Sequence, residues 1–243
     1  MRLTRVHVPG PLTGDRRHTI DGDAANHIAR VLRLRQGDPL TLFDGRGGEY
    51  AARVEEFRKR AVIVSIGERS PVARESSLPI TLAQGVSRGE RMDWVVQKAT
   101  ELGVTRIIPV LTERSVVKLD AKQAERKRVH WQAIAVAACE QSGRDRIPDV
   151  AAPLTMAEFP GRADSRATRV LLSPAGSVRV PDLPRSEGGI VVLIGPEGGL
   201  TDAEQQAAMA TGFVAVRLGP RVLRTETAAV AALTLLQHQF GDL

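Results

Sequence analysis

The chain has 243 residues, and its 34 lysines and arginines against 28 aspartates and glutamates give a formal net charge of +6. This balance favours a polyanionic partner, while an aromatic content of only 3% argues against a base-stacking RNA platform. There is no signal-peptide core and no apolar run long enough to cross a bilayer, so no membrane association is expected. The single cysteine, Cys139, excludes an intrachain disulfide and suits a cytoplasmic location. The five scattered histidines show no metal-ligand spacing, so no metal site is predicted.

Short β-like segments dominate the first part of the chain. They lie at residues 4–8, 40–43, 50–54 and 61–66, with one predicted helix at 24–32. Strands that do not alternate with helices are typical of a small β-barrel. Residues 70–77 have the composition of a linker. The sequence therefore predicts one domain over 1–72 and a second over 73–243.

In the second domain, predicted strands and helices alternate. The strands lie at 80–83, 104–111, 169–172, 190–194 and 213–218, and the helices at 92–102, at 120–141, after 201 and after 225. Such alternation predicts an α/β fold with a mostly parallel sheet.

Two glycine–proline loops near the C-terminus each follow a predicted strand and precede a predicted helix. They are LIGPEGGLT at 193–201 and LGPRVLRTET at 218–227. Loops of this kind lie at the carboxyl ends of strands, where α/β proteins bind ligands, so the two loops predict one pocket. The first loop has neither common phosphate-binding glycine pattern, and Glu197 would repel a phosphate. A neutral or cationic ligand is favoured, and an ordinary tight turn is the alternative.

Arg221 and Arg224 precede a helix of small apolar residues that should be buried. Because arginine is seldom buried without a partner, these side chains either lie on the surface, pair with Glu226, or face an anionic or polar substrate.

Further motifs accompany the two loops in a consistent order along the chain. They are HIARVLR (27–33), FDG (43–45), QKATELGV (97–104), ERSVV (113–117) and ACEQSGR (138–144). Together with the loops, they closely resemble the SPOUT-class RNA methyltransferases, and among these the family that methylates N3 of a uridine in 16S ribosomal RNA. The resemblance extends over essentially the whole chain.

The resemblance implies a homodimeric enzyme that uses S-adenosyl-L-methionine and acts on the 16S rRNA of the small ribosomal subunit. It also implies a SPOUT-type α/β knot, in which the C-terminal end forms a trefoil knot that holds the cofactor, and a small N-terminal PUA-like β-barrel that binds RNA. The residues implied to contact the cofactor are Leu172, Ile194, Gly195, Pro196, Glu197, Gly198, Leu218, Gly219, Val222, Leu223 and Thr227.

Methylation at N3 requires removal of a proton from neutral uracil. Its pKa is on the order of 9 to 10, so ionisation at neutral pH costs about 3 to 4 kcal/mol. Arg224 or Arg221 would stabilise the uracil anion. A carboxylate could take the proton, and Glu197, Glu226 and Glu140 are the candidates within the motifs. Arg224, Arg221 and Glu197 are thus the predicted catalytic residues.

Basic side chains in both domains are candidates for RNA contacts, although any one of them could simply be a solvated surface residue. The set comprises Arg2, Arg5, His27, Arg30, Arg33, Arg88, Arg91 and Arg114.

Three alternatives remain open. A SPOUT enzyme that methylates the ribose 2′-O carries an asparagine-containing segment where this chain has LRTET (223–227), which disfavours that activity. The chain could also be a non-catalytic RNA-binding ribosome-assembly factor, which would differ from a methyltransferase because it would bind no cofactor. An unrelated nucleotide-using α/β enzyme is disfavoured by the missing phosphate motifs.

Overall fold

The computed structural model describes residues 4–14, 16–71, 74–115, 117, 119–162, 164, 166–185 and 187–243. The chain folds into two compact units. The first comprises Met1–Glu75 together with Cys139–Ile147, and the second comprises Ser76–Ala138 together with Pro148–Leu243. Residues 139–147 thus join the first unit, although the sequence analysis divides the chain only once, after residue 72.

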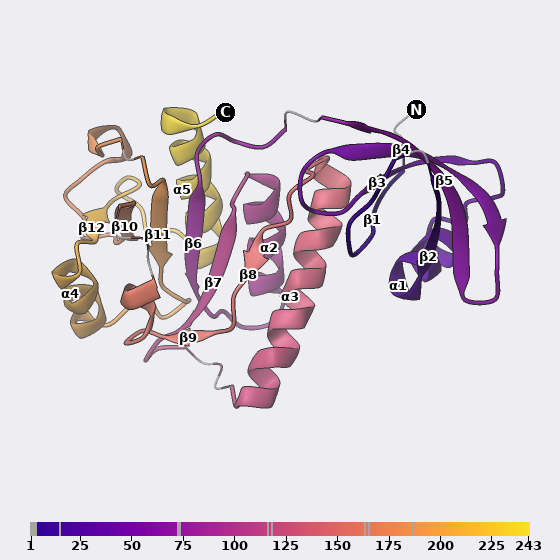
Figure 1. The fold of residues 1–243 in the computed structure, drawn as a ribbon. Helices are drawn as coiled ribbons and strands as arrows, with labels where there is room; N and C mark the ends of the chain where they lie inside the picture. Colours follow the sequence, from indigo (N-terminus) through magenta and orange to yellow (C-terminus); the bar gives the residue numbers. More distant parts are fainter. Residues whose placement is uncertain are drawn as a thin grey trace. The chain divides into compact units, whose positions relative to one another are not determined.

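The first unit contains a five-stranded sheet in the order β1-β3-β4-β5-β2 (Figure 1). Among the strand pairs that the structure describes in this unit, only β1–β3 is parallel. The predicted helix at 24–32 corresponds to α1 (Gly22–Asn26) and the π-helical turn η1 (His27–Val31). The strands are β1 (Arg5–His7), β2 (Arg16–Asp21), β3 (Pro39–Phe43), β4 (Glu49–Phe57) and β5 (Ala61–Ser70).

Strand β2 is absent from the sequence prediction. Its sequence, RRHTID, buries only Ile20. A strand at the end of a sheet needs little apolar alternation, because its register can be set by a single neighbour, here β5.

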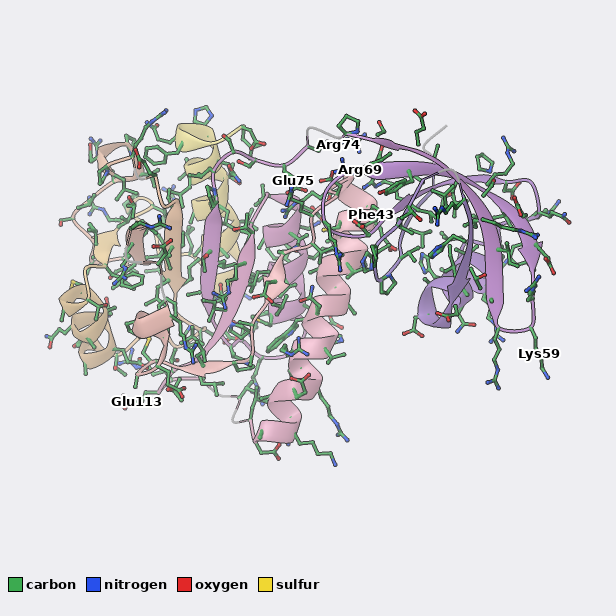
Figure 2. The ribbon with its side chains drawn as sticks, in the orientation of Figure 1. Phe43, Lys59, Arg69, Arg74, Glu75 and Glu113 are labelled. Carbon is green, nitrogen blue, oxygen red and sulfur yellow. The ribbon has the colours of Figure 1, made fainter. Side chains whose placement is uncertain are left out.

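Ion pairs attach residues 139–147 to the rest of the first unit. The Arg144 side chain is 4% exposed, and its Nη2 lies 2.7 Å from the Glu75 carboxylate. The same carboxylate accepts the backbone N–H groups of Asp145 and Arg146. Arg5 donates to the Arg144 carbonyl and pairs with Glu49. Figure 2 labels Glu75 in this region. Glu75 therefore satisfies several donors of the returning segment at once.

The second unit is built on a parallel sheet in the order β12-β10-β11-β6-β7-β8, with β9 also paired to β7. Its strands are β6 (Ile80–Gly85), β7 (Arg106–Leu111), β8 (Asp149–Val150), β9 (Leu154–Thr155), β10 (Thr168–Leu172), β11 (Ile190–Ile194) and β12 (Val214–Val216). Its helices are α2 (Glu90–Glu101), α3 (Ala121–Ser142, of which the end from Cys139 belongs to the first unit), α4 (Asp202–Ala210) and α5 (Thr225–Phe240), with short 3₁₀ turns η2 (Phe159–Arg162) and η3 (Val180–Asp182). The predicted mostly parallel α/β fold is confirmed.

Both faces of this sheet are buried. Alternate residues of β11 enter different cores, because successive strand side chains point to opposite faces. Val192 and Ile194 pack with side chains of α2, α3 and α5. Val191 and Leu193 pack with side chains of α4 and η2. The continuous apolar run at 190–194 reflects this double burial. Among the described residues, no helix is both long enough and apolar enough to cross a membrane.

We expect Arg144→Met to lower the free energy of unfolding of the first unit by about 3–5 kcal/mol, because it leaves the Glu75 carboxylate without its buried partner. Hydrogen exchange of the β3–β5 amides in urea measures this unit separately. Arg17→Met is the matched control, since Arg17 forms an exposed ion pair with Glu55 in the same unit and should change stability little. Equal effects of both variants would contradict a structural role for Glu75.

Candidate functional site

The carboxyl ends of β10, β11 and β12 open into one cavity of about 620 Å³. The sheet order explains why, since β10 lies between β11 and β12. The first glycine–proline loop follows β11, the second follows β12, and Leu172 at the end of β10 lies between them. The volume falls within the range of small-molecule sites.

The first loop is shaped by backbone contacts at its glycines. A side chain at Gly85, at the end of β6, would overlap Pro196, so only glycine allows the loop to approach β6 this closely. A Cβ at Gly198 would lie 3.1 Å from the Arg114 Cβ, and the Arg114 guanidinium donates to the Gly198 carbonyl. The loop then enters α4 through the predicted capping box, in which the Thr201 and Glu204 side chains cap each other's backbone N–H groups.

A buried hydrogen-bond chain joins the first loop to the start of α5. The Thr225 hydroxyl donates to the Gly195 carbonyl over 2.7 Å and accepts from Gln84 Nε2 over 2.9 Å. Gln84 is fully buried at the end of β6. These hydrogen bonds therefore fix the loop after β11 against α5, the helix that follows the second loop.

The second loop presents polar and apolar side chains at the cavity. Gly219 has φ +118°, a conformation that favours glycine. Val222 is 79% exposed although it lines the cavity. Arg221 and Arg224 also line the cavity and are exposed. Within the part of the chain that the structure describes, no ion pair occupies either guanidinium.

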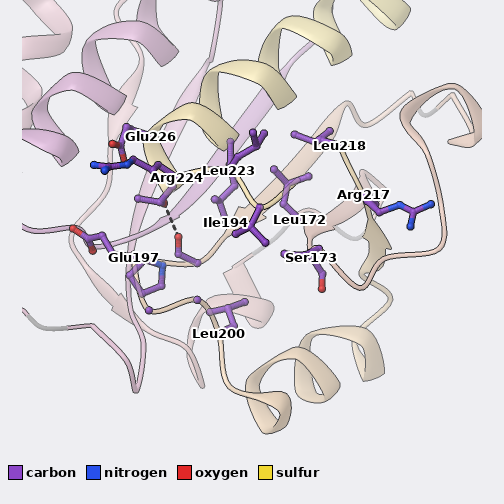
Figure 3. Close-up of a pocket in the computed structure, with 18 of the residues that line it drawn as sticks. Leu172, Ser173, Ile194, Glu197, Leu200, Arg217, Leu218, Leu223, Arg224 and Glu226 are labelled. Atoms are coloured by element: carbon purple, nitrogen blue, oxygen red, sulfur yellow. Dashed lines mark hydrogen bonds between the residues drawn. The ribbon is translucent and has the colours of Figure 1, made fainter. Parts of the chain in front are cut away.

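Charged side chains gather at one end of the cavity, where Figure 3 labels Glu197, Arg224 and Glu226. Arg91 of α2 lies 2.8 Å from Glu197 and 4.0 Å from Glu226. Glu197 also accepts the Arg88 backbone N–H over 2.9 Å. Burial alone would raise the pKa of Glu197, but these hydrogen bonds and the Arg91 charge hold it below its usual value. Glu197 is therefore an ionised carboxylate that accepts hydrogen bonds from Arg88 and Arg91.

The middle of the cavity is apolar. Leu172, Ile194, Leu218 and Leu223 line it, with Leu200 nearby (Figure 3). At the other end, the Ser173 hydroxyl contacts the Gln205 side chain over 2.9 Å, and Arg217 points outward. A ligand with an apolar or aromatic body and charged groups near one end fits this arrangement.

All the cofactor-binding residues predicted from the sequence line this cavity except Thr227, which is exposed on α5. Gly199, Leu200 and Thr225 lie in the two predicted loops, although sequence reasoning assigned them no individual role. Sequence reasoning did not assign to the site Ser173, Pro174, Gln205, Val216, Arg217 and Ala228. Ser173 directly follows a predicted strand, so the carboxyl-end rule could have found it. Gln205 lies inside a helix and offers no such signal.

The residues predicted to bind RNA fall into three groups. Arg30 lies in η1, which begins at the half-buried His27, and Arg33 follows that turn. Both arginines are exposed, and Arg33 has φ +52°, which is uncommon for arginine. Arg91 and Arg114 are engaged with the first loop, while the Arg88 side chain is exposed. The Arg5 side chain is 9% exposed, and its guanidinium lies 4.8 Å from the Phe43 ring centre. Arg5 thus serves the interior of the first unit, and Arg2 lies outside the described residues.

Comparison with known proteins assigns both units. The RNA methyltransferase domain family matches residues 74–237, and the RNA methyltransferase PUA domain family matches residues 20–67. Proteins named ribosomal RNA small subunit methyltransferase E are similar over most of their length. The Buchnera aphidicola (Schizaphis graminum) protein is 31% identical, covering 100% of this chain and 98% of that protein. The Bacillus subtilis protein is 34% identical, covering 91% of this chain and 90% of that protein.

Two solved structures are similar over their full length. A Legionella pneumophila methyltransferase in complex with S-adenosylmethionine has a TM-score of 0.96 and 42% identity, with 100% of each chain covered. A Neisseria gonorrhoeae ribosomal RNA small subunit methyltransferase E bound to S-adenosylmethionine has a TM-score of 0.93 and 38% identity, again with 100% of each chain covered. The chain belongs to the family of RNA methyltransferases that includes the ribosomal RNA small subunit methyltransferase E proteins.

Proposed function

We propose that this protein transfers a methyl group from S-adenosylmethionine to N3 of a uridine in the 16S rRNA of the small ribosomal subunit. The observation that carries the proposal is the cavity itself, which has an apolar middle and one charged end. Leu172, Ile194, Leu218 and Leu223 would hold the adenosyl part, and the loop backbone around Gly195 would contact the remainder. The bound cofactor supplies an electrophilic methyl group. The chain's own residues must then align the base and manage its N3 proton.

Nucleoside analysis tests this function. Unmodified small subunits are incubated with the protein and isotope-labelled S-adenosylmethionine, and the digested rRNA is examined by mass spectrometry. Label in 3-methyluridine supports the proposal. Label in a 2′-O-methylated nucleoside would favour the ribose-methylating alternative. Calorimetry that detects no cofactor binding would favour a non-catalytic assembly factor.

We infer that Arg224 stabilises the uracil anion and that Arg221 assists it, because both guanidinium groups lie at the cavity without an ion pair in the described structure. For Glu197 the geometry supports a positioning role. Its carboxylate connects the first loop to the start of α2 through Arg88 and Arg91.

Arg224→Ala should lower the single-turnover rate of methyl transfer by about 10²–10³-fold, since a charge aimed at the developing anion is removed. Cofactor affinity should be unchanged. The rate of the variant should rise toward high pH, where uridine ionises unaided. Arg179→Ala is a control, because Arg179 is exposed and pairs with Asp182 away from the cavity. A wild-type rate for Arg224→Ala would assign this arginine to structure alone.

We propose that the first unit positions the rRNA through Arg30 and Arg33, with His27 beside them, and that Arg88 of the second unit also binds the RNA. Replacing Arg30 and Arg33 by alanine should weaken RNA binding and reduce the log–log salt slope by about one unit for each phosphate that is no longer neutralised. Filter binding at several salt concentrations measures both quantities. Arg58→Ala is the matched control, because Arg58 already pairs with Glu56. An unchanged slope in the double variant would exclude these arginines from the RNA interface.

We propose that the protein is a homodimer formed through the second unit. Trp94 of α2 and Leu235 of α5 are 41% and 42% exposed on two helices that pack together, and exposed apolar side chains that form one patch mark interaction sites. Light scattering should return about twice the 26.2 kDa mass of the chain. Replacing Trp94 and Leu235 by glutamate should shift the mass toward the monomer, whereas Val129→Glu on α3 should not. A monomer mass for the wild type at micromolar concentration would contradict the proposal.

Two further properties rest on the family assignment. We propose that the second unit contains a trefoil knot near its C-terminus, and that the protein works in the cytoplasm, where small ribosomal subunits are its substrate.

A further inference from the structure

Glu226 has an unusual position in the cavity wall. Its side chain is 20% exposed, and its Oε2 atom is buried without a hydrogen-bond partner in the described structure. Its other oxygen, Oε1, lies 4.0 Å from Arg91 Nε. A buried carboxylate oxygen without a donor is costly, and native proteins retain few such atoms. Glu226 lies at the charged end of the cavity with Arg224 (Figure 3).

The two other candidate proton acceptors, Glu197 and Glu140, are committed elsewhere. Glu197 Oε1 accepts both the Arg88 N–H and the Arg91 guanidinium, at 2.9 and 2.8 Å. These donors stabilise the ionised form of Glu197 and so make it a weak proton acceptor. Glu140 belongs to the first unit, where it accepts the His7 backbone N–H over 2.9 Å. Among the three, only Glu226 combines a place at the cavity with a buried acceptor oxygen that has no donor in the described structure.

We propose that Glu226 is the group that accepts the N3 proton of the target uridine. The inference rests on the proposed function and assigns a residue to its proton-transfer step. Arg224, two positions earlier in the chain, lies at the same end of the cavity. The start of α5 therefore provides both a proton acceptor and a cation that can stabilise the resulting anion.

The step balances without a further reactant. The N3–H bond breaks, its proton moves to the Glu226 carboxylate, and its electron pair stays on the uracil ring. That pair forms the new N3–CH₃ bond, while the thioether leaving group keeps the electrons of the broken S–CH₃ bond. The proton on Glu226 then passes to solvent. A carboxylate is a much weaker base than the uracil anion, so the transfer depends on stabilisation of that anion by Arg224.

The test compares Glu226→Gln with wild type on small subunits that contain either uridine or 5-fluorouridine. Fluorine makes N3–H more acidic and so reduces the need for a base. Glu226→Gln should lower the single-turnover rate on uridine by about 10²–10⁴-fold. The reduction should be much smaller on 5-fluorouridine, and the rate on uridine should rise with pH. Cofactor affinity by calorimetry should be unchanged, since the amide preserves shape.

Glu197→Gln is the comparison variant, because it removes a carboxylate from the same end of the cavity. It should affect both substrates equally, as expected for a residue that positions the loop. Glu226→Asp keeps an acceptor and should retain more activity than Glu226→Gln.

The proposal is overturned if the rate reduction of Glu226→Gln is equal on uridine and 5-fluorouridine. It is also overturned if weaker cofactor binding accounts for the whole reduction, because Glu226 would then hold the cofactor's ammonium group. Failure of the wild-type protein to form 3-methyluridine on either substrate would instead reject the proposed function.

Discussion

The cavity depends on the hydrogen bonds of the Thr225 hydroxyl. This hydroxyl donates to the Gly195 carbonyl and accepts from Gln84, and so connects the first loop, the start of α5 and the end of β6. The Thr225 and Gln84 side chains are buried, and a buried polar group without a partner costs about 1–3 kcal/mol. The loops can therefore hold one arrangement only while this chain of hydrogen bonds is complete. Because Glu226 directly follows Thr225, the same interaction fixes the position of the carboxylate at the charged end.

The cavity combines two chemically different ends within one set of loops. Its apolar middle combines the ends of β10 and β11, whose side chains are apolar because the sheet is buried on both faces, with Leu218 and Leu223 of the second loop. Its charged end derives from the helix starts that follow, where no core packing demands apolar residues. Arg91 of α2 lies between Glu197 and Glu226, one from each loop region. The site is thus a consequence of the βα connections rather than of any single motif.

The sequence predicted the second unit better than the first. Long apolar strands such as 190–194 and the capping box at Thr201 carry strong local signals, and the structure places them as expected. Strand β2 was missed because its register depends on β5 rather than on its own pattern. The return of residues 139–147 to the first unit was also missed, since it depends on the long-range pairing of Arg144 with Glu75. Motif residues such as Glu197 and Glu226 could be found from the sequence, but their different partners could not. Hydrogen bonds of this kind depend on which strands are neighbours, and the chain order alone does not state that.

Net charge was a weaker guide than the partner of each basic group. The chain has six more basic than acidic residues, but several arginines neutralise internal acceptors. Arg144 is buried against Glu75, and Arg5 pairs with Glu49. Such cations position the protein's own segments and contribute little to attraction at a distance, since their charge is already compensated. The groups better able to attract a polyanion are the exposed arginines that form no ion pair within the described residues, notably Arg30 and Arg33 in the first unit and Arg221 and Arg224 at the cavity. These two pairs of arginines suit different tasks. Arg30 and Arg33 can contact phosphates remote from the reaction, whereas Arg221 and Arg224 can stabilise negative charge that develops on the base.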